Sequence, residues 1–302
     1  MKQFLGIVIC LTTLFSSLPA QAQWKKLLKQ LEPKKETQNS NQNKGSKTEN
    51  LIFGGLKALQ GLLPIGYKEE MAIGGAVALE AVARFGGLFE DPSVEKYIAT
   101  VGNAIALTSD RPDIPYYFGI LNTEEPNAFA CPGGYIFMSR GLLKLVQNEA
   151  QLAGILGHEI AHVSKKHALE TIRRSKALAG ISEVTLTALD KDPQMFDSVV
   201  KEVVNMIFEN GLGRTKELEA DKIGVEFAYR VGYNPNALKS FIELLKPHMS
   251  GSRQFSLSKT HPDPKDRAQN LQNVLSQSNY KGSQSLPLLA DRLVTSLSNI
   301  KL

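Results

Sequence analysis

Two histidines and a glutamate have the types and spacing of a catalytic metal site. His158 and His162 flank Glu159 in the segment HEIAH, which lies inside the apolar, helix-compatible run LAGILGHEIAHV. Because successive side chains on a helix turn by about 100°, residues four apart share one face, and their imidazoles can hold one tetrahedral zinc ion. Glu159 then lies beside the open position of the metal. The alternative is a pair of solvated helix histidines beside an unrelated glutamate.

A catalytic zinc needs a third protein ligand, and the best candidate lies in the helix-compatible segment RTKELEADKIG, residues 214–224. Glu217 and Asp221 share one face of such a helix, whereas Glu219 points roughly 200° away from Glu217. Zinc-bound histidines usually donate their second ring N–H to a carboxylate. We therefore predict Glu217 as the third ligand and Asp221 as the acceptor that orients a histidine. By itself, an acidic helix face is usually only solvated.

The two motifs together, HEIAH at 158–162 and ELEAD at 217–221, resemble the gluzincin arrangement. In detail the chain resembles the prenyl-protease/HtpX-like family of zinc endopeptidases, most closely its periplasmic, BepA-like members. The similarity runs from about residue 91 to 267 and includes the segments 127–137 and 261–267. The resemblance implies a mainly α (α+β) fold, a helical zincin-type domain with a small β-sheet beside the HExxH helix. It also implies one Zn²⁺ per chain and proteolysis of other proteins.

The same resemblance assigns substrate binding to the segment around the sequence CPGGY. An extended edge there would pair with the backbone of a substrate strand, with little preference for its sequence. Asn127 would bond the substrate backbone, Gly133 and Gly134 would permit its close approach, and Tyr135 would complete the edge. The plainer alternative is a turn that leads into a strand.

His261 and Arg267 lie in the segment KTHPDPKDR, where a lone histidine beside a proline is usually a surface-loop residue. The resemblance instead implies that His261 approaches the zinc. There it would either donate a hydrogen bond to the oxyanion, as a catalytic residue, or occupy the water position and hold the enzyme latent. We expect Arg267 to orient this loop through Asp263 or Asp266.

Two other residues of reactive type are assigned packing roles. Cys131 is one of only 2 cysteines, and the other lies near the start of the chain, in a segment predicted to be removed. No activating base is evident near Cys131, so a packed thiol is predicted. His167 would be turned about 140° from His162 on a continuous helix, which favours a surface or packing residue over a ligand.

The rest of the chain must position these residues, and its patterns predict one mainly helical domain with a small sheet. Two β-rich segments, 116–121 and 135–138, follow proline or glycine turns and are predicted as strands. The zinc motif falls in a helix predicted over 149–169. Other helices are predicted at 51–63, 71–89, 93–107, 141–146, 177–189, 196–208, 236–245 and 264–276, and around Glu217 as far as Tyr229.

The start of the chain has a different composition. Residues 1–22 combine an early lysine, an apolar run and the sequence AQA, which predicts a secretory signal peptide and export to the periplasm. Residues 23–50 are almost entirely polar and predict a flexible linker, with the zinc metallopeptidase domain at 51–302. Residues 24–31 form either a short amphipathic helix for peripheral contact with the outer membrane or assembly machinery, or a frayed polar end.

The remaining composition excludes some classes of partner. The formal net charge is +5 with mixed signs along the chain, and no nucleic-acid motif is present. The later apolar run at 71–88 contains charges, so it predicts a packed helix and not a membrane span. The oligomeric state is left open.

Three functional hypotheses follow. The leading one is a zinc endopeptidase for misfolded or unassembled envelope proteins, in which Glu159 takes a proton from the attacking water and passes it to the leaving amine. The second is a chaperone-like binding factor whose zinc is structural. The third is a cytosolic processor of prenylated peptides, which the signal peptide argues against. Glu159 favours the enzyme, because a binding factor needs no general base.

Overall fold

A computed structural model describes residues 65–178, 193–249, 257, 260–261, 263–277, 280 and 282–298 of the chain. The predicted signal peptide, the linker and the helix at 51–63 lie outside these residues, as does nearly all of the helix predicted at 177–189.

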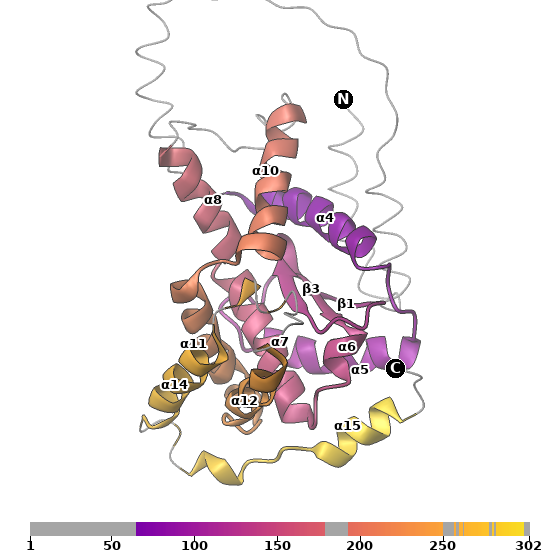
Figure 1. The fold of residues 1–302 in the computed structure, drawn as a ribbon, viewed down its shortest axis with the longest axis vertical. Coiled ribbons are helices and arrows are strands. Elements are labelled where there is room, and N and C mark those ends of the chain that lie inside the picture. Colours follow the sequence, from indigo (N-terminus) through magenta and orange to yellow (C-terminus); the bar gives the residue numbers. More distant parts are fainter. Residues whose placement is uncertain are drawn as a thin grey trace, which may run out of the picture.

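The described chain is mainly helical, as predicted (Figure 1). The helix that carries HEIAH is α7 (Glu149–Ser164), and the helix that carries Glu217 is α11 (Arg214–Val231). The other helices are α4 (Tyr67–Arg84), α5 (Pro92–Ala106), α6 (Arg140–Leu143), α8 (His167–Leu178), α10 (Pro193–Asn205), α12 (Ala237–Met249), α14 (Pro264–Leu275) and α15 (Ala290–Leu297), with short turns η1 (Pro132–Gly134), η2 (Met206–Asn210) and η4 (Ser283–Ser285).

Three short strands form one mixed sheet in the order β1-β3-β2. The strands β1 (Tyr117–Leu121) and β3 (Tyr135–Ser139) correspond to the two predicted strands and pair in parallel. The strand β2 (Ala128–Cys131) pairs antiparallel with β3. In register, β1 starts opposite the start of β3, and β2 runs back along its other side. Within the described chain, β2 is therefore an edge strand.

The sheet is buried on both faces, because its side chains alternate between two hydrophobic clusters. Phe118 and Ile136 point into the larger cluster, which includes buried residues of α5, α7, α11 and α12. Tyr117 and Phe137 point into the smaller cluster with α4, α8 and α10. Figure 1 shows the sheet between these helical groups. Burial on both faces explains why the strands are continuously apolar instead of alternating with polar residues.

The predicted helix over 149–169 is two helices in the structure. The chain turns after α7 because Lys166 has a left-handed backbone with φ 53°, and α8 then starts in a new direction. A left-handed lysine is uncommon, and the sequence carries no glycine or proline there to signal the break. The break changes where His167 points.

The helices α7 and α11 cross with their backbones in contact. A Cβ atom added at Gly157 would lie 2.5 Å from the carbonyl oxygen of Gly224, and one added at Gly224 would lie 2.5 Å from the nitrogen of His158. Such distances are far below van der Waals contact, so only glycine fits at both positions. The crossing therefore brings the first histidine of HEIAH directly against α11.

A buried carboxylate in α4 holds the turn between β2 and β3. Glu70 is 1% exposed and accepts two hydrogen bonds from Arg111, at 2.7 and 3.0 Å. It also accepts one from the backbone N–H of Gly133 at 3.0 Å, and Lys166 lies 3.2 Å away. This carboxylate therefore ties α4 to the η1 turn and to the end of α7.

A second buried carboxylate attaches α15 to the start of α7. Glu149 is fully buried and accepts hydrogen bonds from Tyr97 at 2.8 Å and Tyr233 at 2.6 Å, and it pairs with Arg292 of α15.

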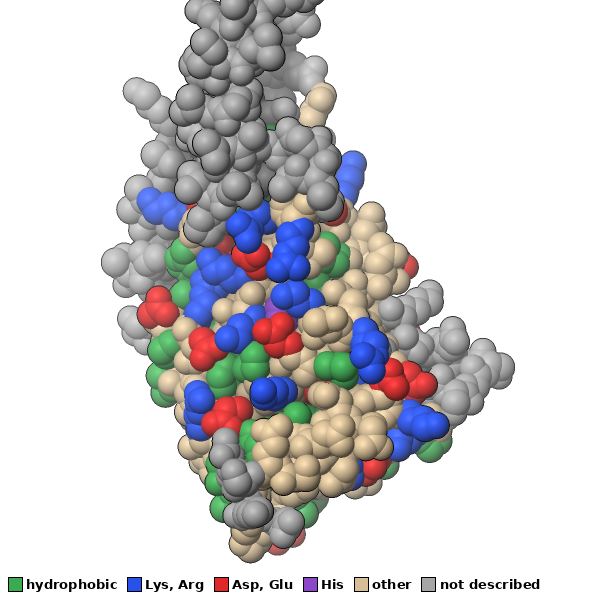
Figure 2. Space-filling model, turned by 90° about the vertical axis from the view of Figure 1, so that its left-hand side faces the viewer, with side chains coloured by type: hydrophobic (Ala, Val, Ile, Leu, Met, Phe, Trp, Pro, Cys, Tyr) green, Lys and Arg blue, Asp and Glu red, His purple; other side chains and the backbone are tan. Residues whose placement is uncertain are grey.

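Among the helices of the described residues, none combines the length and the apolar character that a membrane span requires. On the face shown in Figure 2, basic and acidic side chains are intermixed.

Candidate metal centre

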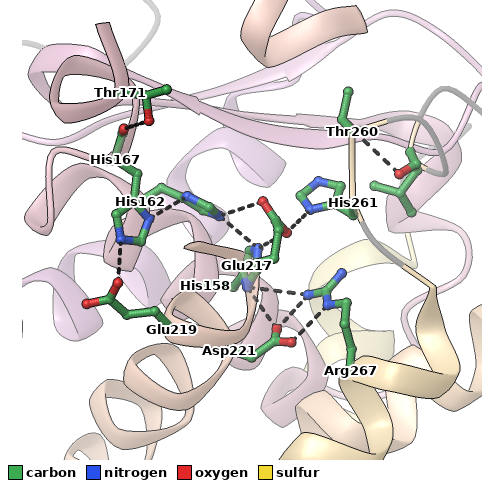
Figure 3. A network of polar contacts seen from close by, with 11 residues as sticks. His158, His162, His167, Thr171, Glu217, Glu219, Asp221, Thr260, His261 and Arg267 are labelled. Carbon is green, nitrogen blue, oxygen red and sulfur yellow. Dashed lines mark hydrogen bonds and ion pairs between the residues drawn. The ribbon is translucent and has the colours of Figure 1, made fainter. Parts of the chain in front are cut away.

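Three buried side chains from α7 and α11 converge on one point (Figure 3). The Nε2 atoms of His158 and His162 lie 3.0 Å apart, and each lies 3.4 Å from a carboxylate oxygen of Glu217. All three side chains are at most 5% exposed. The sequence-based pairing of the two histidines with the distant Glu217 is therefore present in the structure.

The local structure of each helix explains this convergence. The side chain of Asn148 caps α7 by accepting a hydrogen bond from the N–H of Gln151 at 2.9 Å, so the helix is regular through HEIAH. The helix α11 begins after Gly213, whose φ of 90° suits glycine, and Glu217 lies in its first turn. An anionic side chain in the first turn is favoured by the helix dipole.

The donor set fits a zinc ion. With Zn–N and Zn–O distances of about 2.0–2.2 Å, the ligand atoms of a tetrahedral site lie about 3.3 Å apart, close to the separations found here. Burial and the charge of Arg267 disfavour protonation of His158, but hydrogen bonds with Asp221 and Glu217 outweigh them and raise its pKa to about 9. The cluster therefore favours a positive charge at the point where a metal would lie.

Asp221 and Arg267 support His158 from the side opposite the convergence point. His158 Nδ1 lies 2.9 Å from Asp221, the predicted acceptor, and Arg267 donates two hydrogen bonds to the same carboxylate, at 2.6 and 2.9 Å. Burial alone would raise the pKa of Asp221, but the Arg267 guanidinium holds it well below its usual value. A hydrogen bond at Nδ1 leaves Nε2 of His158 available as a ligand.

His162 is supported by a different residue, His167. The Nδ1 atoms of His162 and His167 lie 2.9 Å apart, and His167 Nε2 lies 3.4 Å from the Glu219 carboxylate. His167 is fully buried, and this burial lowers its pKa to about 4. The prediction of a surface or packing residue thus missed a polar contact, because the left-handed Lys166 ends the helical periodicity on which that prediction rested.

Glu159 faces a pocket next to the cluster. It is 2% exposed, and burial raises its pKa above the usual value of a glutamate. The pocket is a partly open depression and not an enclosed cavity. Its polar lining comes from Glu159, His162, Glu217, Thr260 and His261, and its remaining lining from Phe129, Ala130, Met206, Ile207, Gly211 and Leu212.

Comparison with known proteins adds an independent finding. Residues 92–275 match the family described as peptidase family M48. The chain belongs to peptidase family M48. This match, together with the relatives described next, confirms the predicted relationship to this family and its BepA-like members and the predicted metallopeptidase class.

Several curated relatives align with between 63% and 74% of the chain. The chain is 30% identical over 197 residues to the beta-barrel assembly-enhancing protease of Escherichia coli (strain K12), an alignment of 63% of this chain and 40% of the relative. Its counterpart in Yersinia pestis is 28% identical over 239 residues, with 74% and 49% covered. The mitochondrial metalloendopeptidase OMA1 of Schizosaccharomyces pombe is 27% identical over 190 residues, with 63% and 55% covered. The chain thus spans about half the length of these relatives or less.

His261 of this M48 protein lies at the cluster, as the resemblance implied. It is 8% exposed, and its Nδ1 atom lies 2.6 Å from Glu217 Oε2. The prediction that Arg267 acts through Asp263 or Asp266 was wrong, because its guanidinium group binds Asp221 instead. Asp263 caps α14 by accepting from the N–H of Lys265, and Asp266 pairs with Arg214 on the surface.

The residues predicted to bind substrate are not brought to the metal cluster. Asn127 is buried just before β2, and its backbone N–H donates to Ser139 Oγ. The N–H of Gly133 is bonded to Glu70, and Gly134 packs against the backbone of residue 115. Tyr135 is buried in the central strand. None of the four lines the pocket described above, so their contact with substrate stays a prediction.

The neighbouring residues Phe129 and Ala130 of β2 line the pocket instead. Both residues belong to the segment 127–137 that was predicted to bind substrate, but the prediction did not name them. Their signal was present as a short apolar stretch, AFAC, which forms the edge strand. Cys131, at the end of that strand, is a buried free thiol, and burial raises its pKa, which agrees with a packing role.

Proposed function

We propose that this M48 protein is a zinc endopeptidase that hydrolyses peptide bonds of misfolded or unassembled cell-envelope proteins. The observation that carries the proposal is the convergence of His158, His162 and Glu217, with Glu159 facing the same pocket. Family membership supports the peptidase activity. A purely structural zinc would not need a buried glutamate beside it.

The roles of the residues follow from their positions. A zinc ion held by His158, His162 and Glu217 would supply the Lewis acidity that activates water and polarises a peptide carbonyl. Glu159 takes a proton from the attacking water and delivers it to the leaving amine. Its raised pKa suits this exchange, because a base works best when its pKa is close to the working pH. His261 either bonds the developing oxyanion or holds the resting enzyme latent.

The pocket suggests how a substrate would be held. Among the described residues, β2 pairs only with β3, and we infer that its other edge pairs with an extended peptide near Phe129 and Ala130. The apolar lining from Phe129, Ile207 and Leu212 suits an apolar substrate side chain. Apolar side chains on extended backbone are what unfolded proteins expose, so this arrangement supports a substrate class and not one specific sequence.

The predicted signal peptide supports a periplasmic location. Relatives from Escherichia coli and Yersinia pestis are named beta-barrel assembly-enhancing proteases. We therefore include peripheral contact with the outer membrane or with assembly machinery in the proposal, and protein substrates as the partners.

The test compares the wild type with Glu159→Gln on an unfolded protein such as casein, with and without a chelator. Glu243→Gln is the matched control, because Glu243 is a solvent-exposed glutamate on α12. Glu159→Gln should retain zinc and lose at least about 100-fold in cleavage rate, the usual contribution of a general base. The control and the untreated wild type should cleave equally.

Two results would contradict the proposal. Cleavage at the wild-type rate by zinc-loaded Glu159→Gln would remove the assigned role of the glutamate. A zinc-loaded wild type that binds casein without cutting it would support the chaperone-like binding factor instead.

A further inference from the structure

The mechanism above leaves one buried titratable residue near the site without a role. His167 has no exposed surface, yet it does not belong to the three-residue cluster. Its Nδ1 atom lies 2.9 Å from Nδ1 of His162, on the side of that ring away from the cluster (Figure 3). A buried histidine whose contact with a candidate ligand is at that ligand's outer nitrogen can fix the orientation and tautomer of the ligand.

The directions of the hydrogen bonds follow from the metal site. If His162 Nε2 is a ligand, it must present a lone pair, so the proton of the neutral ring lies on Nδ1. That proton can be donated only to an acceptor, and the nearest is Nδ1 of His167. A neutral imidazole has one donor and one acceptor, so His167 then carries its proton on Nε2.

The outer nitrogen of His167 faces a carboxylate that suits this arrangement. His167 Nε2 lies 3.4 Å from Glu219, which is longer than a good hydrogen bond. The Glu219 side chain is 41% exposed and contacts Lys216 at 3.8 Å, so solvent screens this outer pair. The stronger contact is therefore the inner one, between the two rings.

The backbone explains why His167 reaches this position. Lys166 turns the chain with a φ of 53°, and His167 begins α8 with its carbonyl accepting a hydrogen bond from Thr171 at 2.8 Å. On α11, Glu219 lies between Glu217 and Asp221. One segment of five residues, 217–221, therefore supplies Glu217 of the cluster, the Asp221 partner of His158 and the Glu219 partner of His167.

We propose that His167 is a positioning residue that holds His162 in the Nδ1–H tautomer, with Glu219 supporting His167 from outside. The proposal rests on the metal site of the proposed function. The two ligating histidines are then supported differently, His158 by one buried carboxylate and His162 through a second imidazole. His167 does not contact the reacting atoms. Because it holds a ligand of the metal in place, its removal should weaken metal binding.

The test measures zinc affinity by competition with a chelator of known affinity, with the full chain carrying Glu159→Gln to prevent self-cleavage. His167→Leu removes the accepting nitrogen. His167→Asn introduces a side chain of nearly the same size as leucine, but its amide oxygen lies close to the position of the original Nδ1 atom. Loss of an outer partner of a ligating histidine typically costs about 10- to 100-fold in metal affinity. We expect a loss of that size in His167→Leu and recovery to within about threefold of the parent in His167→Asn.

The outcomes separate this inference from the proposed function. Equal zinc affinity in the parent and His167→Leu would overturn the role of His167 while leaving the metal site intact. Equal losses in the leucine and asparagine variants would also overturn it, because size and not an acceptor would then be responsible. A parent that binds no zinc would instead overturn the proposed function.

A third variant covers the case in which His167→Leu does not fold, as judged by circular dichroism. Glu219→Gln changes a partly exposed side chain and should lower zinc affinity by about two- to fivefold, less than the inner substitution because the contact is long and screened. Parental zinc affinity in His167→Asn, together with this smaller loss in Glu219→Gln, would still support the positioning role of His167. Unchanged zinc affinity in Glu219→Gln would show that Glu219 does not support His167.

Discussion

The interaction between Asp221 and Arg267 allows the most quantitative prediction for this protein. Asp221 is fully buried and Arg267 is 7% exposed, and the two make hydrogen bonds of 2.6 and 2.9 Å. The substitution Asp221→Asn keeps the size and shape of the side chain but removes its charge. Arg267 would then remain buried, against His158, without the carboxylate to which it donates both hydrogen bonds.

The expected cost can be worked from these contacts. Two hydrogen bonds between charged groups contribute about 1.5–3 kcal/mol each. Their sum overlaps the roughly 3–5 kcal/mol lost when one partner of a buried ion pair is removed. For a domain of this size, 1 kcal/mol corresponds to about 2–4 °C in the melting temperature. Asp221→Asn should therefore lower the melting temperature by about 6 to 20 °C.

The assay is thermal unfolding followed by circular dichroism, with a chelator present so that metal binding does not contribute. Asp266→Asn is the matched control, because Asp266 pairs with Arg214 at 2.9 Å on the surface, where the side chains are 50% and 62% exposed. An exposed pair contributes at most about 1 kcal/mol. If Asp221→Asn lowers the melting temperature no more than Asp266→Asn, the reasoning about the buried pair is refuted.

The same pair predicts a dependence on pH. The pKa of Asp221 is lower in the folded protein than the value of about 3.9 in an unfolded chain. Its contribution to stability is therefore complete above that value and is lost as the pH falls through the folded pKa. The difference in melting temperature between the wild type and Asp221→Asn should shrink as the pH falls below about 4, because the wild type then also loses the charge that the variant lacks.

Two further predictions concern the metal cluster. Gly224→Ala should cost about 1–3 kcal/mol in unfolding free energy and weaken zinc binding, because its Cβ atom would lie 2.5 Å from the nitrogen of His158; unchanged melting temperature and zinc affinity would contradict the close crossing of α7 and α11. Zinc binding at pH 7.5 should release about one proton per ion, because the pKa of His158 is about 9 without metal and a ligating imidazole must be neutral. Titration calorimetry in buffers of different ionisation enthalpy measures the number of protons released. A release near zero would show that His158 is not protonated before the metal binds.

The local part of the site could be predicted from the sequence. HEIAH lies on one helix, and Glu217 and Asp221 share a face of another, because helical periodicity places such residues together over one turn. Two of the three strands were also predictable, since β-rich segments followed turn residues. The fold class followed from the same patterns and from the resemblance to a family.

The contacts that the sequence did not reveal are those between distant segments. Arg267 binds Asp221, 46 residues away, while two nearer aspartates in sequence have other roles. No periodicity carries that information. The role of His167 was hidden for a local reason, since a lysine in the left-handed conformation ends α7 without any of the usual breaker residues. Glycines 157 and 224 gave no signal either, because their meaning depends on the helix that crosses them.

The two buried carboxylates outside the metal cluster have a consequence for how this protein could be divided. Glu70 lies before the family match at 92–275 and Arg292 lies after it, but each neutralises a charged partner inside that stretch. A fragment trimmed to residues 92–275 would leave Arg111 and Glu149 without these partners, although both side chains are largely buried. We therefore expect a fragment of residues 92–275 to be less stable than one that also contains Glu70 and Arg292, because each of these residues is the counterion of a charge inside the matched stretch.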